Sequence, residues 1–149
     1  MLNSDFRDVL SIFNDRDVEY LLVGAYALAV HGLPRATGDI DILVLTTPRN
    51  AQRAFESLGE FGAPMDQVTT EDFTEKGIVF QIGIAPRRID VLTSIDGVEF
   101  VDAWQDRSIV QIEGLSVPVI SREHLIANKR ATGRPQDLAD VAWLEAHPP

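Results

Sequence analysis

Cysteine is absent from the sequence of 149 residues, which excludes disulfide bonds and thiolate metal sites and favours a cytoplasmic location. Long apolar runs are absent as well. No stretch approaches the roughly 18 consecutive apolar residues of a membrane-spanning helix. The first residues, Met1 to Asp5, have neither the basic start nor the apolar run of a signal peptide. We therefore expect no membrane segment.

Positive charge is scarce. The chain has 13 Lys and Arg residues against 23 Asp and Glu residues, which gives a net charge of −10. Such a balance argues against broad, nonspecific binding of nucleic acid, although it leaves room for a small basic pocket. The length predicts one domain, and a hydrophobic content of 45% is sufficient for a core.

The most informative stretch spans residues 20–45. It predicts an apolar strand over 20–23, a short Ala-rich helix that ends at His31, and a second strand over 39–45. A chain segment of this length would bring the turn after the first strand close to the start of the second.

Two acids open the second strand. Asp39 and Asp41 share one face because strand side chains alternate, and Leu43 and Leu45 continue that face. A solvated face is one interpretation, but the leucines favour a strand that is covered on both sides. Two carboxylates about 4 Å apart repel by roughly 4 kcal/mol at an effective dielectric near 20, and a bound cation would remove that repulsion. We therefore favour a metal site.

The turn at Gly24 and Ala25 comes where a strand gives way to a helix. By itself a glycine there indicates a plain tight turn, but free backbone N–H groups also make such a turn a candidate phosphate-binding site. The nearby Asp39–Asp41 strand favours phosphate binding. Arg35, shortly before the acids, would either bind phosphate or balance their charge.

A third acid lies in a later strand. Alternation over 78–84 predicts one strand, and 88–92 predicts an antiparallel neighbour that contains Asp90. In isolation Asp90 is typical of a surface acid at a strand end. If its strand lies beside the strand of Asp39 and Asp41, it becomes the third carboxylate of one cluster.

The remaining sequence predicts helices and one hairpin. Pro118 predicts an edge position for the second strand of the hairpin over 109–119. Lys129, Arg130 and Arg134 form the densest basic cluster, for which a solvated helix end is the simplest interpretation. We expect an α/β (α+β) fold, a single domain in which helices flank a mixed β-sheet. Helices are expected over 4–13, 47–58, 99–106, 121–132 and from Pro135 onward.

Together these residues resemble the polymerase-β-like nucleotidyltransferase superfamily. More narrowly they resemble its small AbiEii-type members, which are associated with bacterial toxin–antitoxin and abortive-infection systems. The landmarks lie in 23–28, 31–32 and 34–41, and continue with Asp90, Lys129 and 134–140. The resemblance implies a polymerase-β-like nucleotidyltransferase fold over residues 1–149, with a core at 18–92 and a C-terminal hairpin and helices at 99–147.

The activity that this resemblance implies is transfer of a nucleoside monophosphate from a nucleoside triphosphate to an acceptor hydroxyl. Two Mg²⁺ ions would be held by Asp39, Asp41 and Asp90, which with Lys129 would be the catalytic residues. The nucleotide would contact Gly24, Ala25, Arg35, Thr37, Lys129 and Asp137, and Asp137 and Asp140 would orient the lysine or neighbouring groups. RNA or tRNA would be the acceptor, and a protein antitoxin the partner.

One departure from the superfamily concerns the phosphate turn, where Gly-Ser is usual. Ala25 has no hydroxyl, so backbone N–H groups would have to make that contact. Three functions stay open: a toxin-like transferase acting on RNA, a transferase acting on a small molecule or protein hydroxyl, and a noncatalytic nucleotide-binding or interaction module. The three acids weigh against the module. The acidic composition weighs against a large RNA acceptor, while the resemblance favours one.

Overall fold

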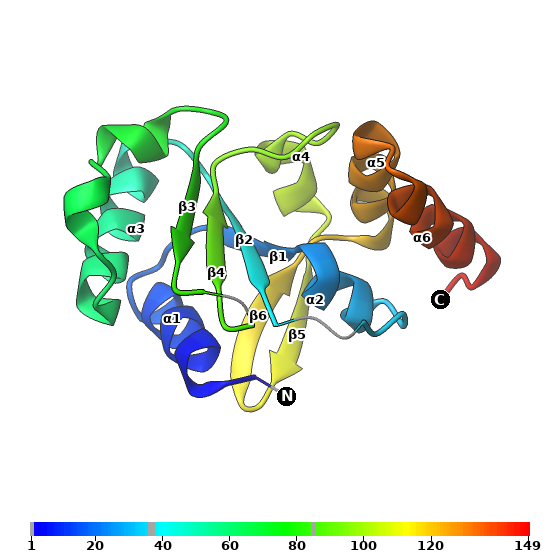
Figure 1. Ribbon diagram of the computed structural model, residues 1–149, viewed down its shortest axis with the longest axis horizontal. Coiled ribbons are helices and arrows are strands. Elements are labelled where there is room, and N and C mark those ends of the chain that lie inside the picture. Colours follow the sequence, from blue (N-terminus) through cyan, green and yellow to red (C-terminus); the bar gives the residue numbers. More distant parts are fainter. Residues whose placement is uncertain (1, 36–37, 85) are drawn as a thin grey trace.

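A mixed sheet of six strands, in the order β3-β4-β2-β1-β6-β5, forms the frame of the molecule (Figure 1). The structure is a computed structural model that describes residues 2–35, 38–84 and 86–149. The strands are β1 (Tyr20–Val23), β2 (Ile40–Val44), β3 (Val79–Ile82), β4 (Ile89–Leu92), β5 (Ser108–Ile112) and β6 (Leu115–Val119). The single α/β domain with a mixed sheet and flanking helices is thus confirmed.

Helices pack around this sheet, with α3 at one end of the molecule and the α5–α6 pair at the other (Figure 1). The α-helices are α1 (Ser4–Asp15), α2 (Gly24–Val30), α3 (Pro48–Phe61), α4 (Phe100–Gln105), α5 (Arg122–Thr132) and α6 (Pro135–Ala146). Two short 3-10 helices, η1 (Met65–Gln67) and η2 (Glu71–Thr74), follow α3. None of the helices in the described part of the chain has the length and apolarity that crossing a bilayer requires.

The centre of the sheet sets the positions of the acidic residues. Strand β1 runs antiparallel to β2, with Val23 opposite Asp41, and β2 runs parallel to β4, with Asp41 opposite Asp90. The far side of β4 pairs with β3 in antiparallel orientation. The predicted neighbours of the 88–92 strand are therefore confirmed on both sides.

The helix boundaries follow from local capping chemistry. The Thr47 hydroxyl accepts a hydrogen bond from Asn50 N at the start of α3, where Pro48 takes the first position. The Ser121 hydroxyl accepts one from His124 N at the start of α5, and Gly133, with φ 65°, ends that helix in the left-handed region. Both helices begin where the sequence predicts.

The prediction for Pro118 is wrong. Strand β6 lies between β1 and β5, so it is an internal strand, and β5 is the edge. Its pairing with β1 is confined to the end near Val119, where Ile120 N donates to Leu22 O at 3.1 Å. The missing N–H of Pro118 is tolerated because this short ladder takes its donor from a residue beyond the proline.

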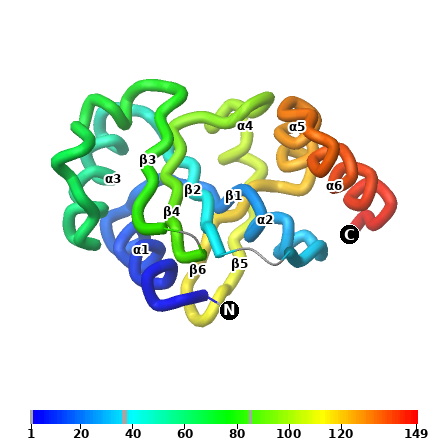
Figure 2. Tube along the Cα trace, in the orientation of Figure 1, coloured from blue at the N-terminus to red at the C-terminus, as the bar shows by residue number. Residues whose placement is uncertain are grey.

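The N-terminal segment lies against the β5–β6 turn, as the trace in Figure 2 shows. Leu2 N donates to Glu113 Oε2 at 2.7 Å, and the Arg7 guanidinium donates to Glu113 O at 2.9 Å. Four residues of α1 are fully buried against the sheet: Phe6, Val9, Leu10 and Phe13. The first helix and the C-terminal hairpin therefore share one core.

Asn50 is a buried polar residue that joins three segments, and the sequence alone gives no sign of its role. Its amide oxygen accepts from Glu19 N at 2.7 Å, while its amide nitrogen donates to Glu19 O at 3.0 Å and Leu45 O at 2.8 Å. These bonds tie α3 to the entry of β1 and to the exit of β2. They satisfy backbone groups that would otherwise be left without partners away from water.

Asn50→Ala should lower the free energy of unfolding by about 3 kcal/mol, because it leaves partly buried backbone groups unsatisfied. Urea unfolding of the variant and the parent protein measures this change. Gln52→Ala, on the exposed side of the same helix, is the matched control and should change stability by no more than about 0.5 kcal/mol. Equal stability of the two variants would show that water satisfies the backbone groups of Glu19 and Leu45 without loss of stability.

Candidate active site

Three carboxylates gather at one end of β2 and β4. Asp41 and Asp90 stand opposite each other in the parallel pair, and Asp39 precedes β2 by one residue. The side chain of Asp90 is 10% exposed and that of Asp39 is 27% exposed. The position predicted for Asp90, as the third carboxylate of one cluster, is confirmed.

The charge of Asp41 is disfavoured in this setting. Burial, followed by the charges of Asp90 and Asp39, raises the pKa of Asp41 to about 6. A hydrogen bond between the carboxyl groups of Asp41 and Asp90 contributes in the same direction. The cluster is therefore short of positive charge, which is the condition under which carboxylates bind a cation.

The turn at Gly24 touches this cluster directly. Gly24 has φ 67°, and a Cβ atom on it would collide with the carboxyl group of Asp41. Glycine is required there both by its backbone conformation and by the approach of the acid. The strand–helix turn and the Asp39–Asp41 strand meet, as the spacing predicts.

Arg88 is a participant that the sequence analysis did not single out. Its Nε donates to Asp90 Oδ1 at 2.8 Å and its Nη2 to Asp90 Oδ2 at 3.1 Å, while the same Nη2 lies 3.2 Å from Asp39 Oδ2. The signal was present in the sequence. Arg88 precedes Asp90 by two residues, so strand alternation places both side chains on one face.

Helices α5 and α6 supply the facing wall of a cavity of about 490 Å³. Lys129 Nζ lies 2.9 Å from Asp140 Oδ2 and 3.7 Å from Asp137 Oδ1, and its side chain is only 12% exposed. Burial, and then the neighbouring Arg35 and Arg134, lower the pKa of Lys129, and Asp137 opposes this change. The solvated-helix-end interpretation is wrong for Lys129, whereas the predicted pairing with Asp137 is confirmed.

Asp137 also pairs with residues other than Lys129. It accepts from Arg134 Nε at 2.7 Å and from the Thr132 hydroxyl at 2.8 Å, and it caps the first turn of α6. The hydrogen bond from Arg134 is the main reason that the pKa of Asp137 falls to about 2. Asp137 is thus a fixed anion that holds two cations at the edge of the cavity.

Arg35 forms an ion pair with Asp140 and lines the same cavity as Gly24, Ala25, Asp41 and Lys129. This position lets the arginine face a ligand in that cavity together with Lys129. Thr37, the remaining predicted nucleotide contact, lies outside the described residues. Of the expected nucleotide-side residues, the cavity brings together Gly24, Ala25, Arg35, Lys129 and Asp137.

A magnesium site fits the donor set at the acids. Within residues 2–35, 38–84 and 86–149, no three His, Asp or Glu side chains form a ready-made cage for a metal ion. Mg²⁺ does not need one, because it is usually held by one or two carboxylates together with water and substrate phosphates. Asp41, whose negative charge is disfavoured by its acidic neighbours, and Asp90 beside it meet that requirement.

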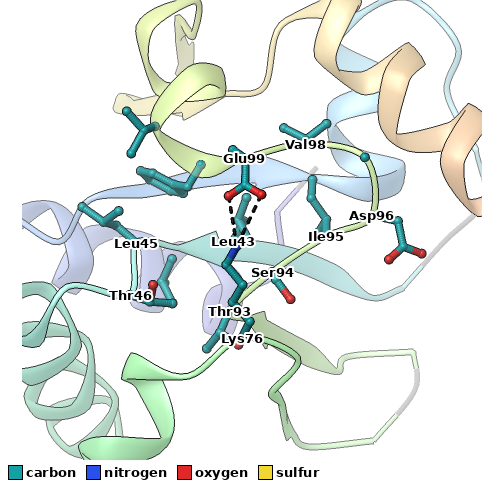
Figure 3. A pocket seen from close by; sticks show the side chains of 14 residues that line it. Leu43, Leu45, Thr46, Lys76, Thr93, Ser94, Ile95, Asp96, Val98 and Glu99 are labelled. Atoms are coloured by element: carbon teal, nitrogen blue, oxygen red, sulfur yellow. Dashed lines mark hydrogen bonds and ion pairs between the residues drawn. The ribbon is translucent and has the colours of Figure 1, made fainter.

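A second cavity, of about 330 Å³, lies at the opposite end of β2 and β4 (Figure 3). Figure 3 shows the Lys76–Glu99 ion pair across it, with Nζ 3.1 Å from Oε2. Its walls come from the ends of the two strands and from the loop after β4, and none of the three acids lines it. Asp41 lines the α5–α6 cavity instead, so this second cavity is separate from the acids.

Solved structures with a similar fold are nucleotidyltransferases. A putative nucleotidyltransferase from Thermotoga maritima, TM1012, has a TM-score of 0.64 at 18% identity over 95% of this chain and 91% of its own. The lincosamide antibiotic adenylyltransferase LnuA, bound to lincomycin, has a TM-score of 0.61 at 16% identity over 98% of each chain. ANT(2")-Ia, in complex with adenylyl-2"-tobramycin, has a TM-score of 0.62 at 16% identity, covering 95% of this chain and 86% of that one.

The fold is therefore that of the nucleotidyltransferases. The chain itself belongs to the family described as nucleotidyltransferase of unknown function (DUF6036), which it matches over residues 2–145. No curated protein matches the chain significantly. The prediction of a nucleotidyltransferase is confirmed at the level of this family, and the AbiEii-type subgroup stays a prediction.

The raised pKa of Asp41 predicts that the free energy of unfolding depends on pH. Its pKa of about 6 in the folded chain exceeds the unfolded value of about 3.9, so the folded state binds more protons between those pH values. Stability should then fall as the pH rises from about 4 to about 6. Asp41→Asn should remove this loss, raising the free energy of unfolding by about 2 kcal/mol at neutral pH and changing it little near pH 4.

Urea unfolding in metal-free buffer at both pH values measures this effect. Asp66→Asn, on an exposed acid of η1, is the control and should leave stability within about 0.5 kcal/mol of the parent at either pH. A destabilised Asp41→Asn variant at neutral pH would contradict the assignment of repulsion at the cluster.

Proposed function

We propose that this protein transfers a nucleoside monophosphate from a nucleoside triphosphate to the hydroxyl group of a small organic acceptor, with Mg²⁺ as the cofactor. One observation carries the proposal. Asp41, which is paired with Asp90 in the sheet and touches the glycine turn, lines one cavity together with the cations Lys129, Arg35 and Arg134. A metal-binding wall opposite a cationic wall is the arrangement that a triphosphate requires.

The cationic wall would hold the triphosphate. Lys129 and Arg134 are already oriented by Asp137, and Arg35 by Asp140, so little side-chain freedom would be lost when phosphate oxygens bind. The turn at Gly24 and Ala25 would contribute backbone N–H groups, because Ala25 has no hydroxyl to offer. The nucleotide would thus lie across the cavity, with its reactive phosphate towards the acids.

Asp39, Asp41 and Asp90 would hold two Mg²⁺ ions. When bound, these ions would lower the pKa of the acceptor hydroxyl and neutralise the charge of the departing pyrophosphate. The hydroxyl proton would pass to the Asp41–Asp90 pair. These two carboxyl groups stand opposite each other on the parallel strands β2 and β4.

Two observations favour a small acceptor. The net charge of −10 opposes the approach of a large polyanion such as RNA. Two proteins of similar fold are antibiotic-modifying enzymes by their descriptions, one bound to lincomycin and one to an adenylylated tobramycin. An RNA or tRNA acceptor with a protein antitoxin, which the AbiEii-type resemblance implies, is the alternative that the experiment must separate.

The test is incubation with each α-labelled nucleoside triphosphate and Mg²⁺, with EDTA as the metal-free control. Separate reactions contain lincomycin, tobramycin, a panel of other hydroxyl compounds, total RNA or tRNA, and the label is then located. Transfer to a small compound that is lost in Asp41→Asn supports the proposal. Label on RNA would move the acceptor to the toxin-like class, and binding without transfer would leave a nucleotide-binding module.

Lys129→Ala should raise the KM for the nucleotide and lower kcat, with kcat/KM falling about tenfold or more, since it removes a charged contact to phosphate. The variant should also lose about 1–3 kcal/mol of stability, because Asp140 is buried and loses one of the two cations that pair with it among the described residues. Kinetics are therefore measured well below its melting temperature. Lys76→Ala, an exposed lysine at the other cavity, is the control. Wild-type nucleotide kinetics in Lys129→Ala would transfer the phosphate contact to Arg35.

A further inference from the structure

The guanidinium of Arg88 pairs with two of the three acids, and Arg88 is not among the residues that line the α5–α6 cavity. It engages both oxygens of Asp90, at 2.8 and 3.1 Å, and Oδ2 of Asp39 at 3.2 Å. One nitrogen, Nη2, is shared between the two acids. Carboxylate oxygens that a metal ion would use are therefore already engaged by a cation of this chain, through hydrogen bonds on Asp90 and an ion pair on Asp39.

The backbone of Arg88 is fixed, whereas its side chain has room to move. Its carbonyl oxygen accepts from Ile40 N at 3.0 Å, which continues the β2–β4 pairing up to this residue. The side chain is 32% exposed. Among the contacts of its head group in the described chain, ion pairs join it to Asp39 and Asp90 only. Loss of these two partners would let the guanidinium turn towards solvent without disturbing the strand.

We propose that Arg88 is the resting counter-ion of the acid cluster and that a divalent cation binds there by displacing its guanidinium. The inference rests on the proposed function, since it takes the three acids to be the metal site. Arg88 is then a positioning residue. It holds Asp39 and Asp90 in place while no metal is present, and the incoming ion competes with it for the same oxygens.

Arg88 could either compete with the metal ion or support the carboxylates that bind it. The change in metal affinity when its side chain is removed distinguishes these two roles. If the guanidinium competes with the ion, removing its positive charge should strengthen metal binding. If it only holds the carboxylates in place for the ion, its removal should weaken binding. Competition is the expected outcome because a bidentate pair with Asp90 must open before that carboxylate can turn to a metal.

The experiment measures binding of Mn²⁺ alone, without nucleotide, by calorimetry and by the paramagnetic resonance of free Mn²⁺, which accepts the same oxygen ligands as Mg²⁺. Arg88→Ala should bind Mn²⁺ about tenfold more tightly than the parent. Arg88→Lys keeps the charge and should stay near the parent. Arg87→Ala, on the exposed neighbouring arginine, should match the parent.

Thermal unfolding gives a second readout. Without metal, Arg88→Ala should melt at a lower temperature than the parent, because Asp39 and Asp90 lose the guanidinium that pairs with both. Mn²⁺ should raise its melting temperature by more than it raises that of the parent. If Arg88→Ala does not fold, Arg88→Gln, which is neutral and keeps one donor group, serves for the same comparison.

Equal or weaker Mn²⁺ binding by the charge-free variant would overturn the inference, as would the absence of Mn²⁺ binding in every protein. These results differ from a failure of the proposed function. Metal-dependent transfer by the parent protein together with unchanged Mn²⁺ affinity in Arg88→Ala would leave the transferase standing and remove only the role given to Arg88.

Discussion

Repulsion among three carboxylates is the constraint on which the rest of the site depends. The parallel pairing of β2 and β4 places Asp41 opposite Asp90, and no choice of rotamer separates side chains on directly paired positions very far. The fold accepts this arrangement because Arg88 neutralises part of the charge and because Asp41 retains a proton more readily than a solvated acid. Under the proposed function, a bound cation would relieve this repulsion.

The α5–α6 side of the cavity gathers positive charge instead of negative charge. Lys129, Arg35 and Arg134 would repel one another at the edge of a cavity, and two buried acids, Asp137 and Asp140, hold them there. Both acids belong to α6, so a single helix fixes all three cations. Aspartates therefore serve two opposite purposes in this molecule: those on the sheet concentrate negative charge, and those on α6 organise positive charge.

Local signals in the sequence were enough for most of the fold. The proline and hydroxyl at Thr47–Pro48, the glycine at Gly133 and the alternation around Asp90 each act within a few residues, so the elements could be located. Strand pairings between distant parts of the chain could not be predicted from such local signals. The internal position of β6, and therefore the place of Pro118, depends on Leu22 and Val119, which are far apart in the chain. At the site, the strand acids were predictable by alternation, whereas the partners of Arg35 and Arg88 depended on which elements pack together.

The pairing of β6 with β1 also divides the site between two parts of the chain. All three acids lie in the part that ends with β4, where β1, β2, β3 and β4 pair with one another. Lys129 and Arg134 belong to the part that follows β6, and β6 joins the sheet through Leu22 and Val119, which are far apart in the chain. The place of these two cations therefore depends on a long-range strand contact, which is slow to form, whereas the alignment of Asp41 with Asp90 depends on strands within residues 20–92.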